Sequence, residues 1–191
     1  DPELKPAPLA GLSETERAYC LDRGARPGSV FFLTHRFAPR ILRDQVLSLQ
    51  SLMVDLESVL WEVSEPAVAL AKLGWWQKEL EPSTRQRSQH PAIQAGNRSG
   101  LFQVAGEAEL ERLIVDTGRL AGGEPIGERS ALIAHCHALG GSEVRLLASV
   151  DGTRIDGEGA NALGAAMVLT RFAERLGSAL PGECWWVPLK D

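Results

Sequence analysis

A row of apolar residues spaced by threes and fours between residues 42 and 63 constrains the fold of this chain most strongly. Pro39 precedes the row at a position suited to the first turn of a helix, where its missing N–H costs no hydrogen bond. Side chains spaced in this way lie on one stripe of an α-helix, as in a helix packed inside a bundle. The stripe consists of Leu42, Val46, Leu49, Met53, Leu56, Leu60 and Val63. We therefore predict one long helix that packs along its length.

Helical patterns recur along the rest of the sequence. Ser13 and Glu16 form a capping-box pattern that begins a first helix ending near Arg23. A short apolar piece, VFFLTHRF, follows, and Ser64 is the predicted cap of a helix that begins at Pro66. Further helices are predicted over residues 66–80, 107–121, 128–149 and 158–177. These segments occupy most of the chain.

The remaining segments are polar or rich in turn-forming residues. Residues 82–100 predict a long connection with one helical turn after Pro91, and LLASVDGTRIDGEG predicts a loop. The sequence contains no Val/Ile-rich alternating segment of strand length. We therefore predict an all-α helical bundle, with an irregular arm at residues 1–12 and one domain at residues 13–191.

Composition and charge exclude several classes of protein. The 191 residues are 44% hydrophobic and 24% charged, with a net charge of −5, as in ordinary globular chains. The acidic balance argues against a nucleic-acid partner, and no apolar run is long enough for a transmembrane segment. Cys20, Cys136 and Cys184 are odd in number and widely spaced, which favours a reducing compartment over a disulfide framework. We expect a protein that is cytoplasmic or peripheral to a membrane.

Two short motifs look like ligand sites but have simpler explanations. GEGANA at residues 157–162 fits a loose dinucleotide-binding pattern, yet no clear strand precedes it, and we interpret it as the start of a helix. HCH at residues 135–137 places two imidazoles two positions apart, and such side chains diverge on a helix. We interpret this second motif as a partly buried polar face rather than a metal site.

The tandem Trp75–Trp76 marks a helix that is apolar on two sides. Neighbouring residues on a helix diverge by about 100°, so Trp76 falls on the side of Leu73 and Leu80. Trp75 falls on another side, with Val68. Such a helix lies between two layers or beside a pocket. Core packing is the simpler interpretation, and the wall of a ligand site is the alternative.

The order of several segments resembles that of the squalene/phytoene synthase family. The segments are YCLDRGARPGSVFFLTHRFAPRILRDQVLSLQSL, AVALAKLGWWQKEL, HP, HCHALGGSEVRLLA and WWVPL, and they extend from Tyr19 to Leu189. Members of this family fold as an all-α isoprenoid-synthase bundle around a cavity. Active members join two prenyl diphosphates head to head, using Mg²⁺ held by two aspartate-rich motifs on facing helices. The resemblance implies the same bundle here, shortened at its C-terminus.

Both aspartate-rich motifs are degenerate in this sequence. Mg²⁺ prefers hard oxygen ligands, so each motif requires carboxylates one helical turn apart. The first motif falls on Glu57, Ser58 and Trp61, where only one acid remains. The second falls on Arg175 and Ala179, and a guanidinium group repels a metal ion. No cofactor is therefore expected, and Mg²⁺ is expected only if the protein is a divergent enzyme.

Other charged residues near the two motifs are interpreted as surface groups. On a helical wheel Asp55 and Glu62 share one flank of the apolar stripe, while Glu57 lies on the other. Boundary and solvent positions explain the three acids better than a metal site does. Glu174 is expected to point away from the second motif.

A basic residue and two aromatic residues are candidates for ligand binding. Arg43 matches the arginine-rich start of a family helix, where it is a candidate contact for a phosphate group. An exposed helix arginine is the alternative interpretation. Trp75 and Trp76 complete the set of candidate ligand-binding residues.

The resemblance and the degenerate motifs lead to two main hypotheses. In the first, the protein has lost Mg²⁺-dependent prenyl transfer and is a lipid- or isoprenoid-binding protein, or an assembly or accessory factor. Mitochondrial complex I assembly factors of the same family offer a precedent for eroded aspartate motifs. In the second, the protein is a divergent prenyltransferase of terpenoid biosynthesis that uses Glu57 and other acids such as Asp116. The expected partners are a prenyl or other lipid ligand, and a protein partner such as an active synthase or a second copy in a homo-oligomer.

Overall fold

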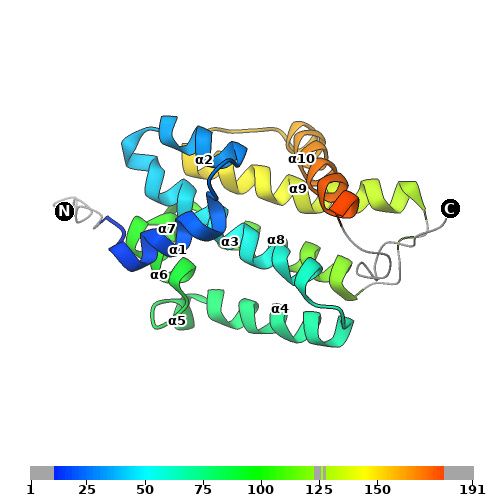
Figure 1. Ribbon diagram of the computed structural model, residues 1–191, viewed down its shortest axis with the longest axis horizontal. Coiled ribbons are helices and arrows are strands. Elements are labelled where there is room, and N and C mark those ends of the chain that lie inside the picture. The colour runs from blue at the N-terminus through cyan, green and yellow to red at the C-terminus, as the bar shows by residue number, and fades with distance from the viewer. Residues whose placement is uncertain (1–10, 123–125, 127, 179–191) are drawn as a thin grey trace, which may run out of the picture.

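Every regular element in the described part of the chain is a helix (Figure 1). The computed structural model describes residues 11–122, 126 and 128–178. The helices are α1 (Glu14–Gly24), α2 (Val30–Thr34), the 3-10 helix η1 (His35–Phe37), α3 (Arg40–Glu62), α4 (Pro66–Leu80), α5 (Pro82–Arg85), α6 (Pro91–Ser99), α7 (Leu101–Val104), α8 (Glu107–Gly122), α9 (Arg129–Asp151) and α10 (Gly157–Ser178). The predicted all-α class is confirmed. Among the described residues, no helix combines the length and the apolar character needed to cross a lipid bilayer.

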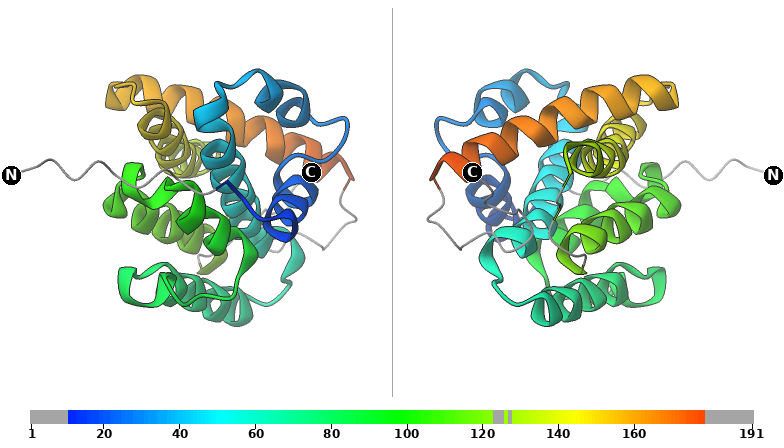
Figure 2. Two further views of the ribbon diagram at one scale, coloured as in Figure 1. Left: turned by 90° about the vertical axis from the view of Figure 1, so that its left-hand side faces the viewer. Right: turned by 90° about the vertical axis from the view of Figure 1, so that its right-hand side faces the viewer.

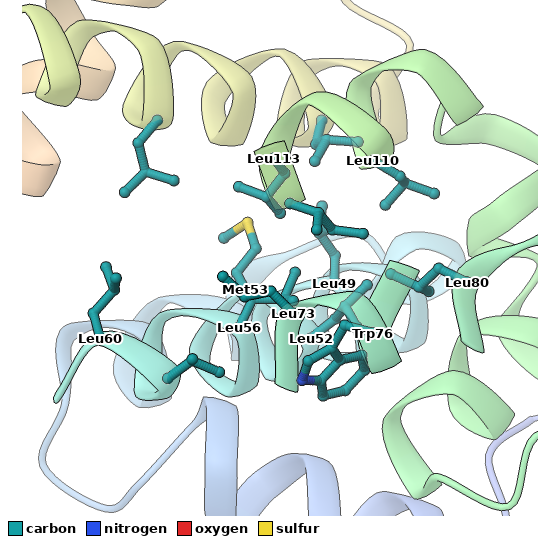
Figure 3. Packing of buried hydrophobic residues seen from close by; sticks show 14 of the residues in the cluster. Leu49, Leu52, Met53, Leu56, Leu60, Leu73, Trp76, Leu80, Leu110 and Leu113 are labelled. Atoms are coloured by element: carbon teal, nitrogen blue, oxygen red, sulfur yellow. The ribbon is translucent and has the colours of Figure 1, made fainter. Parts of the chain in front are cut away.

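Helix α3 runs through the middle of the bundle, with α4 on one side and α9 and α10 towards the other (Figures 1 and 2). Buried leucines of α3 face apolar side chains of α4 and α8 (Figure 3). The labelled residues are Leu49, Leu52, Met53, Leu56 and Leu60 of α3, Leu73, Trp76 and Leu80 of α4, and Leu110 and Leu113 of α8. Burial of a leucine contributes roughly 1.5–3 kcal/mol relative to exposure. The predicted stripe is therefore the central core contact of the molecule.

Local sequence signals set several helix ends. The Oγ of Ser13 accepts a hydrogen bond from the N–H of Glu16, whose carboxylate accepts one from the N–H of Ser13. The predicted capping box is therefore confirmed, and Pro39 directly precedes α3. The predicted capping role of Ser64 is wrong, because Glu65 occupies the cap position of α4 without a side-chain hydrogen bond. Proline at the first position of α4 still favours its start there.

The connection over residues 82–100 contains more helix than the single predicted turn. It forms α5 and the 9-residue α6, and Gly100 ends α6 with a φ of 75°. Ala92, Ile93 and Ala95 are fully buried where α6 packs against α1 and α3. Tertiary burial therefore stabilises a helix that its polar sequence does not predict.

Helices α9 and α10 form a closely packed pair (Figure 2). Gly152, with a φ of 71°, ends α9 and allows the chain to turn back. Where the two helices cross, a Cβ atom added to Gly140 would lie 2.1 Å from the carbonyl oxygen of Gly164. The two backbones therefore touch at a point where only glycine fits. This contact holds α10, and the side chains that it carries, close to α9.

Some predicted features lie outside the described residues. They are most of the irregular arm at residues 1–12, together with Ala179, Cys184 and the WWVPL segment. At the described end of the arm, Leu12 is buried and its N–H donates to the carboxylate of Asp44. This end of the arm therefore packs against α3.

Candidate functional site

A positively charged side chain lies between two carboxylates from different helices. Arg171 of α10 places its Nε atom 3.0 Å from Oε2 of Glu57 in α3, as an ion pair. Its Nη2 atom donates to both carboxylate oxygens of Glu143 in α9, at 2.7 Å each. The Glu143 side chain is only 2% exposed. We call Glu57, Glu143 and Arg171 the Arg171 cluster, because this arginine joins three helices through its ion pairs.

Burial and charge act in opposite directions within the Arg171 cluster. Burial raises the pKa of Glu143, and the nearby guanidinium group opposes this rise only in part. Burial alone would lower the pKa of Arg171, but the carboxylates of Glu143 and Glu57 outweigh it and raise that pKa. A guanidinium group stays protonated in proteins in any case. Arg171 therefore keeps its charge, whereas burial favours the neutral form of Glu143.

A pocket of about 360 Å³ lies beside the cluster, between α3 and α10. It is lined by Val54, Glu57, Ser58 and Trp61 of α3 and by Arg171, Glu174 and Arg175 of α10. The structure thus brings together Glu57, Ser58, Trp61 and Arg175, which the sequence placed in two separate degenerate motifs. Ala179 lies outside the described residues. Glu174 lines the same pocket, and the expected direction of its side chain, away from the second motif, stays a prediction.

An aromatic ring occupies the place where the first motif would have its second acid. The Trp61 ring packs edge-on against Phe172, with ring centroids 5.3 Å apart. The guanidinium carbon of Arg175 lies 5.9 Å from the centre of the Trp61 ring, within the range of a cation–π contact. The indole Nε1 of Trp61 donates to Oε1 of Glu57 at 3.4 Å. Trp61 therefore both fills space and contacts the one acid that remains in the motif.

Comparison with known families assigns the chain to a family. The family model described as squalene/phytoene synthase matches residues 25–188. The chain belongs to this family. No curated protein and no solved structure matches the chain. The all-α bundle is the architecture that the squalene/phytoene synthase family implies, and the pocket lies between the helices that carry its two motif positions.

The residues of this pocket do not fit the Mg²⁺ that the squalene/phytoene synthase family implies. Both Glu57 and Glu143 already pair with Arg171. Arg175 adds a second positive charge to the lining, the indole of Trp61 offers no oxygen ligand, and Glu174 is the one acid of the lining outside the Arg171 cluster. Across the part of the chain that the structure describes, no three His, Cys, Asp or Glu side chains are grouped so as to hold a metal ion. A divalent ion in this pocket would meet two guanidinium groups.

Asp55 is buried, so its predicted position at the boundary with solvent is wrong. Its side chain is 5% exposed and accepts hydrogen bonds from Nε of Arg23 at 2.6 Å and from the hydroxyl of Tyr19 at 3.1 Å. Burial, and then the charge of Asp55, raise the pKa of Tyr19 to about 12. Glu62 is 61% exposed and lies 3.8 Å from Nη1 of Arg23, which confirms that Glu62 and Asp55 share a flank of α3.

Replacement of Asp55 by asparagine is expected to destabilise the fold by about 2 kcal/mol, because the half-buried Arg23 loses the closer and more buried of its two charged partners. Chemical denaturation at neutral pH measures this change. The matched control is Glu62→Gln, which removes an exposed charge from the same flank and is expected to cost at most about 0.5 kcal/mol. Equal effects of the two variants would contradict the assignment of Asp55 as the principal partner of Arg23.

The two tryptophans of α4 have different environments. Trp76 is buried with Leu73 and Leu80, as the helical wheel predicts, whereas Trp75 is 45% exposed. Their ring centroids lie 5.1 Å apart, and both rings contact His90. Trp75 and His90 line an open pocket of about 380 Å³ whose lining residues differ from those beside the Arg171 cluster. Core packing accounts for Trp76, and ligand binding by either tryptophan stays a prediction.

The structure also describes Arg43, the HCH motif and two of the cysteines. Nε of Arg43 donates to the carbonyl of Ala38 at 2.9 Å, so this side chain holds the turn before α3, and its contact with a phosphate stays a prediction. In the HCH motif, Cys136 is buried and both histidines are half-buried, as expected for a partly buried face. Burial raises the pKa of Cys20 and of Cys136 to about 11, which makes both thiols poor nucleophiles.

Sequence reasoning missed two members of the Arg171 cluster, Glu143 and Arg171. Each is a charged residue within a run of small and apolar residues, ALGGSEV and AAMVLTRFA. A charge on the buried side of a helix needs a partner of opposite sign. That signal marks both residues for pairing, although it does not identify which charge pairs with which.

Proposed function

We propose that this member of the squalene/phytoene synthase family has lost Mg²⁺-dependent head-to-head prenyl transfer and binds an isoprenoid or similar lipid as an accessory protein. The Arg171 cluster is the observation that carries the proposal. In the family reaction, Mg²⁺ and basic side chains stabilise the departing diphosphate while a carbocation forms. Here a fixed side-chain cation already pairs with Glu57, at a motif position, and with the buried Glu143.

The cost of displacing Arg171 supports this proposal. Glu143 is almost fully buried, and both its oxygens accept hydrogen bonds from the guanidinium group. A metal ion would have to separate this pair and leave a second cation in the same low-dielectric region. Separating a buried ion pair costs roughly 3–5 kcal/mol. The Arg171 cluster therefore favours the guanidinium group of Arg171, a permanent cation, over an exchangeable metal ion at this place.

The lining of the pocket favours an amphipathic ligand. Val54 and the ring of Trp61 provide apolar surface, and Arg171 and Arg175 provide positive charges beside the carboxylates of Glu57 and Glu174. Glu57 already pairs with Arg171. A chain with a polar head group matches this combination, with any anionic part of the head near Arg175. The volume of about 360 Å³ lies near the lower end of the range of small-molecule sites, which is roughly 300–1,000 Å³. A single ligand with a short chain therefore suits the pocket better than two prenyl diphosphates side by side.

The alternative of a divergent prenyltransferase that uses Glu57 and Asp116 receives less support. Asp116 pairs with Arg119 at 2.9 Å and accepts a hydrogen bond from Ser142 at 3.1 Å. It lines a different pocket, of about 590 Å³, together with Arg112 and Arg119. Two acids that line different pockets do not form one metal site. A protein partner, such as an active synthase, remains compatible with an accessory role.

Farnesyl diphosphate is expected to bind without being turned over. Incubation of the purified protein with farnesyl diphosphate, Mg²⁺ and NADPH as the hydride donor should give neither coupled hydrocarbon nor free pyrophosphate, while an active squalene synthase assayed in parallel gives both. Calorimetric titration should show binding that Arg175→Gln weakens by about tenfold, because the variant removes a positive charge from the lining.

The control variant is Arg154→Gln, which changes an exposed arginine in the loop between α9 and α10. Turnover at a rate typical of enzymes would contradict the loss of catalysis. Absence of binding, or equal weakening by both variants, would contradict the assignment of this pocket as the lipid site.

A further inference from the structure

The four most exposed large apolar side chains of the described residues lie between residues 30 and 41. Val30 is 78% exposed, Leu33 57%, Phe37 86% and Ile41 78%. They come from α2, η1 and the first turn of α3, at the periphery of the bundle (Figure 2). Single exposed apolar residues are normal on protein surfaces. Four within twelve positions of the chain are a local concentration that calls for an explanation.

The inner side of the same segment is anchored to the fold. Phe31 and Phe32 pack against a small core formed by residues such as Cys20 and Leu47. The Nδ1 atom of His35 lies 3.1 Å from the carbonyl oxygen of Phe31. The helical spacing of residues 30, 33 and 37 then directs a second apolar stripe outward. The exposure of this stripe therefore follows from an ordered, packed segment.

The segment that carries the outward stripe is rich in arginine. Residues 23–43 contain five arginines and no Asp or Glu, in a chain whose net charge is −5. Arg23 pairs with Asp55, but Arg26, Arg36 and Arg40 are exposed. Within the described part of the chain, no carboxylate forms an ion pair with these three or with Arg43. We call residues 26–43 the α2–η1 surface.

We propose that the α2–η1 surface docks on an anionic lipid bilayer. Short apolar side chains interleaved with arginines suit the boundary between head groups and acyl chains, where the apolar groups insert and the cations meet lipid phosphates. Charge complementarity favours this occupant over a second copy of the chain. In a two-fold contact the same arginines would face one another without an intervening carboxylate. The proposal does not depend on the pocket beside the Arg171 cluster.

Co-sedimentation with lipid vesicles tests the proposal. The intact protein is expected to bind vesicles of equal parts phosphatidylglycerol and phosphatidylcholine at least about tenfold more tightly than vesicles of phosphatidylcholine alone. Added salt should weaken this binding, because the attraction is between exposed charges. Phe37→Ser/Ile41→Ser and Arg36→Gln/Arg40→Gln are each expected to weaken binding to the anionic vesicles by about tenfold.

The matched control is Val68→Ser/Leu163→Ser, which removes two exposed apolar side chains elsewhere on the surface and should leave vesicle binding unchanged. Circular dichroism checks that every variant stays helical. Equal binding of the intact protein to both kinds of vesicle, or binding to neither, would overturn the proposal without use of any variant. If light scattering instead finds a dimer that Phe37→Ser/Ile41→Ser converts to a monomer, a second copy covers this surface and the proposal is wrong.

Discussion

Replacement of Gly140 by alanine is expected to destabilise the protein by about 3 kcal/mol or more, and to prevent cooperative folding if the two helices cannot move apart. The added Cβ would lie 2.1 Å from the carbonyl oxygen and 2.2 Å from the carbonyl carbon of Gly164. Backbone atoms cannot rotate away as the end of a flexible side chain can. Denaturation in urea, followed by circular dichroism, measures the loss.

The matched control for this variant is Gly74→Ala in α4. A Cβ atom at Gly74 would meet no atom within 4 Å, and the residue is exposed within the helix. Alanine there is expected to stabilise the fold by roughly 0.5–1 kcal/mol through its higher helix propensity. A loss below about 1 kcal/mol for Gly140→Ala would contradict the tight contact between α9 and α10.

The spacing of apolar residues and the positions of helix-breaking residues were sufficient to predict most of the helices. The predicted segments 107–121, 128–149 and 158–177 end within two residues of the bounds of α8, α9 and α10. Long amphipathic helices carry a repeated signal, so one unusual residue does not change their interpretation. Helix α6 was predicted only as a single turn after Pro91, for the converse reason. It is short and polar, and it is stabilised by its contacts with α1 and α3.

The candidate site could be predicted only in part, because a sequence places a residue on a helix but does not name its partner. The degenerate positions Glu57, Trp61 and Arg175 were identified, and they line one pocket. The buried state of Asp55 was missed, because Arg23 reaches it from another helix, 32 positions away in the sequence. Glu143 and Arg171 were missed because each is stabilised in a buried position by its ion pair with the other, and the sequence does not show this pairing.

The two flanks of α3 illustrate one physical rule. On one flank Asp55 pairs with Arg23 of α1, and on the other Glu57 pairs with Arg171 of α10. A charge that leaves water is tolerated when a charge of opposite sign accompanies it. The acids beside the apolar stripe therefore connect α3 to its neighbours. Asp55 and Glu57 are therefore more than a solvated face.

Replacement of Arg171 by methionine is expected to destabilise the protein by roughly 3–5 kcal/mol at neutral pH, because it leaves the buried carboxylate of Glu143 without its partner. Burial already raises the pKa of Glu143 in the intact protein, and removal of the guanidinium group takes away the interaction that opposes this rise. A raised pKa in the folded state means that folding favours the protonated carboxyl. The loss should therefore be smallest below the pKa of glutamate in the unfolded chain, about 4.3, and should grow as the pH rises through the folded-state value.

Two further variants separate the buried charge from loss of packing. Arg171→Met/Glu143→Leu removes both charges, so it is expected to be more stable at neutral pH than Arg171→Met alone and to show a weaker dependence on pH. Arg175→Met, one turn later in α10, replaces an exposed arginine and should cost no more than about 1 kcal/mol. Urea denaturation of all three variants across a range of pH gives the comparison. If Arg171→Met lost the same stability at every pH, or if the double variant were no more stable than the single one, Glu143 would not depend on Arg171 for its charge.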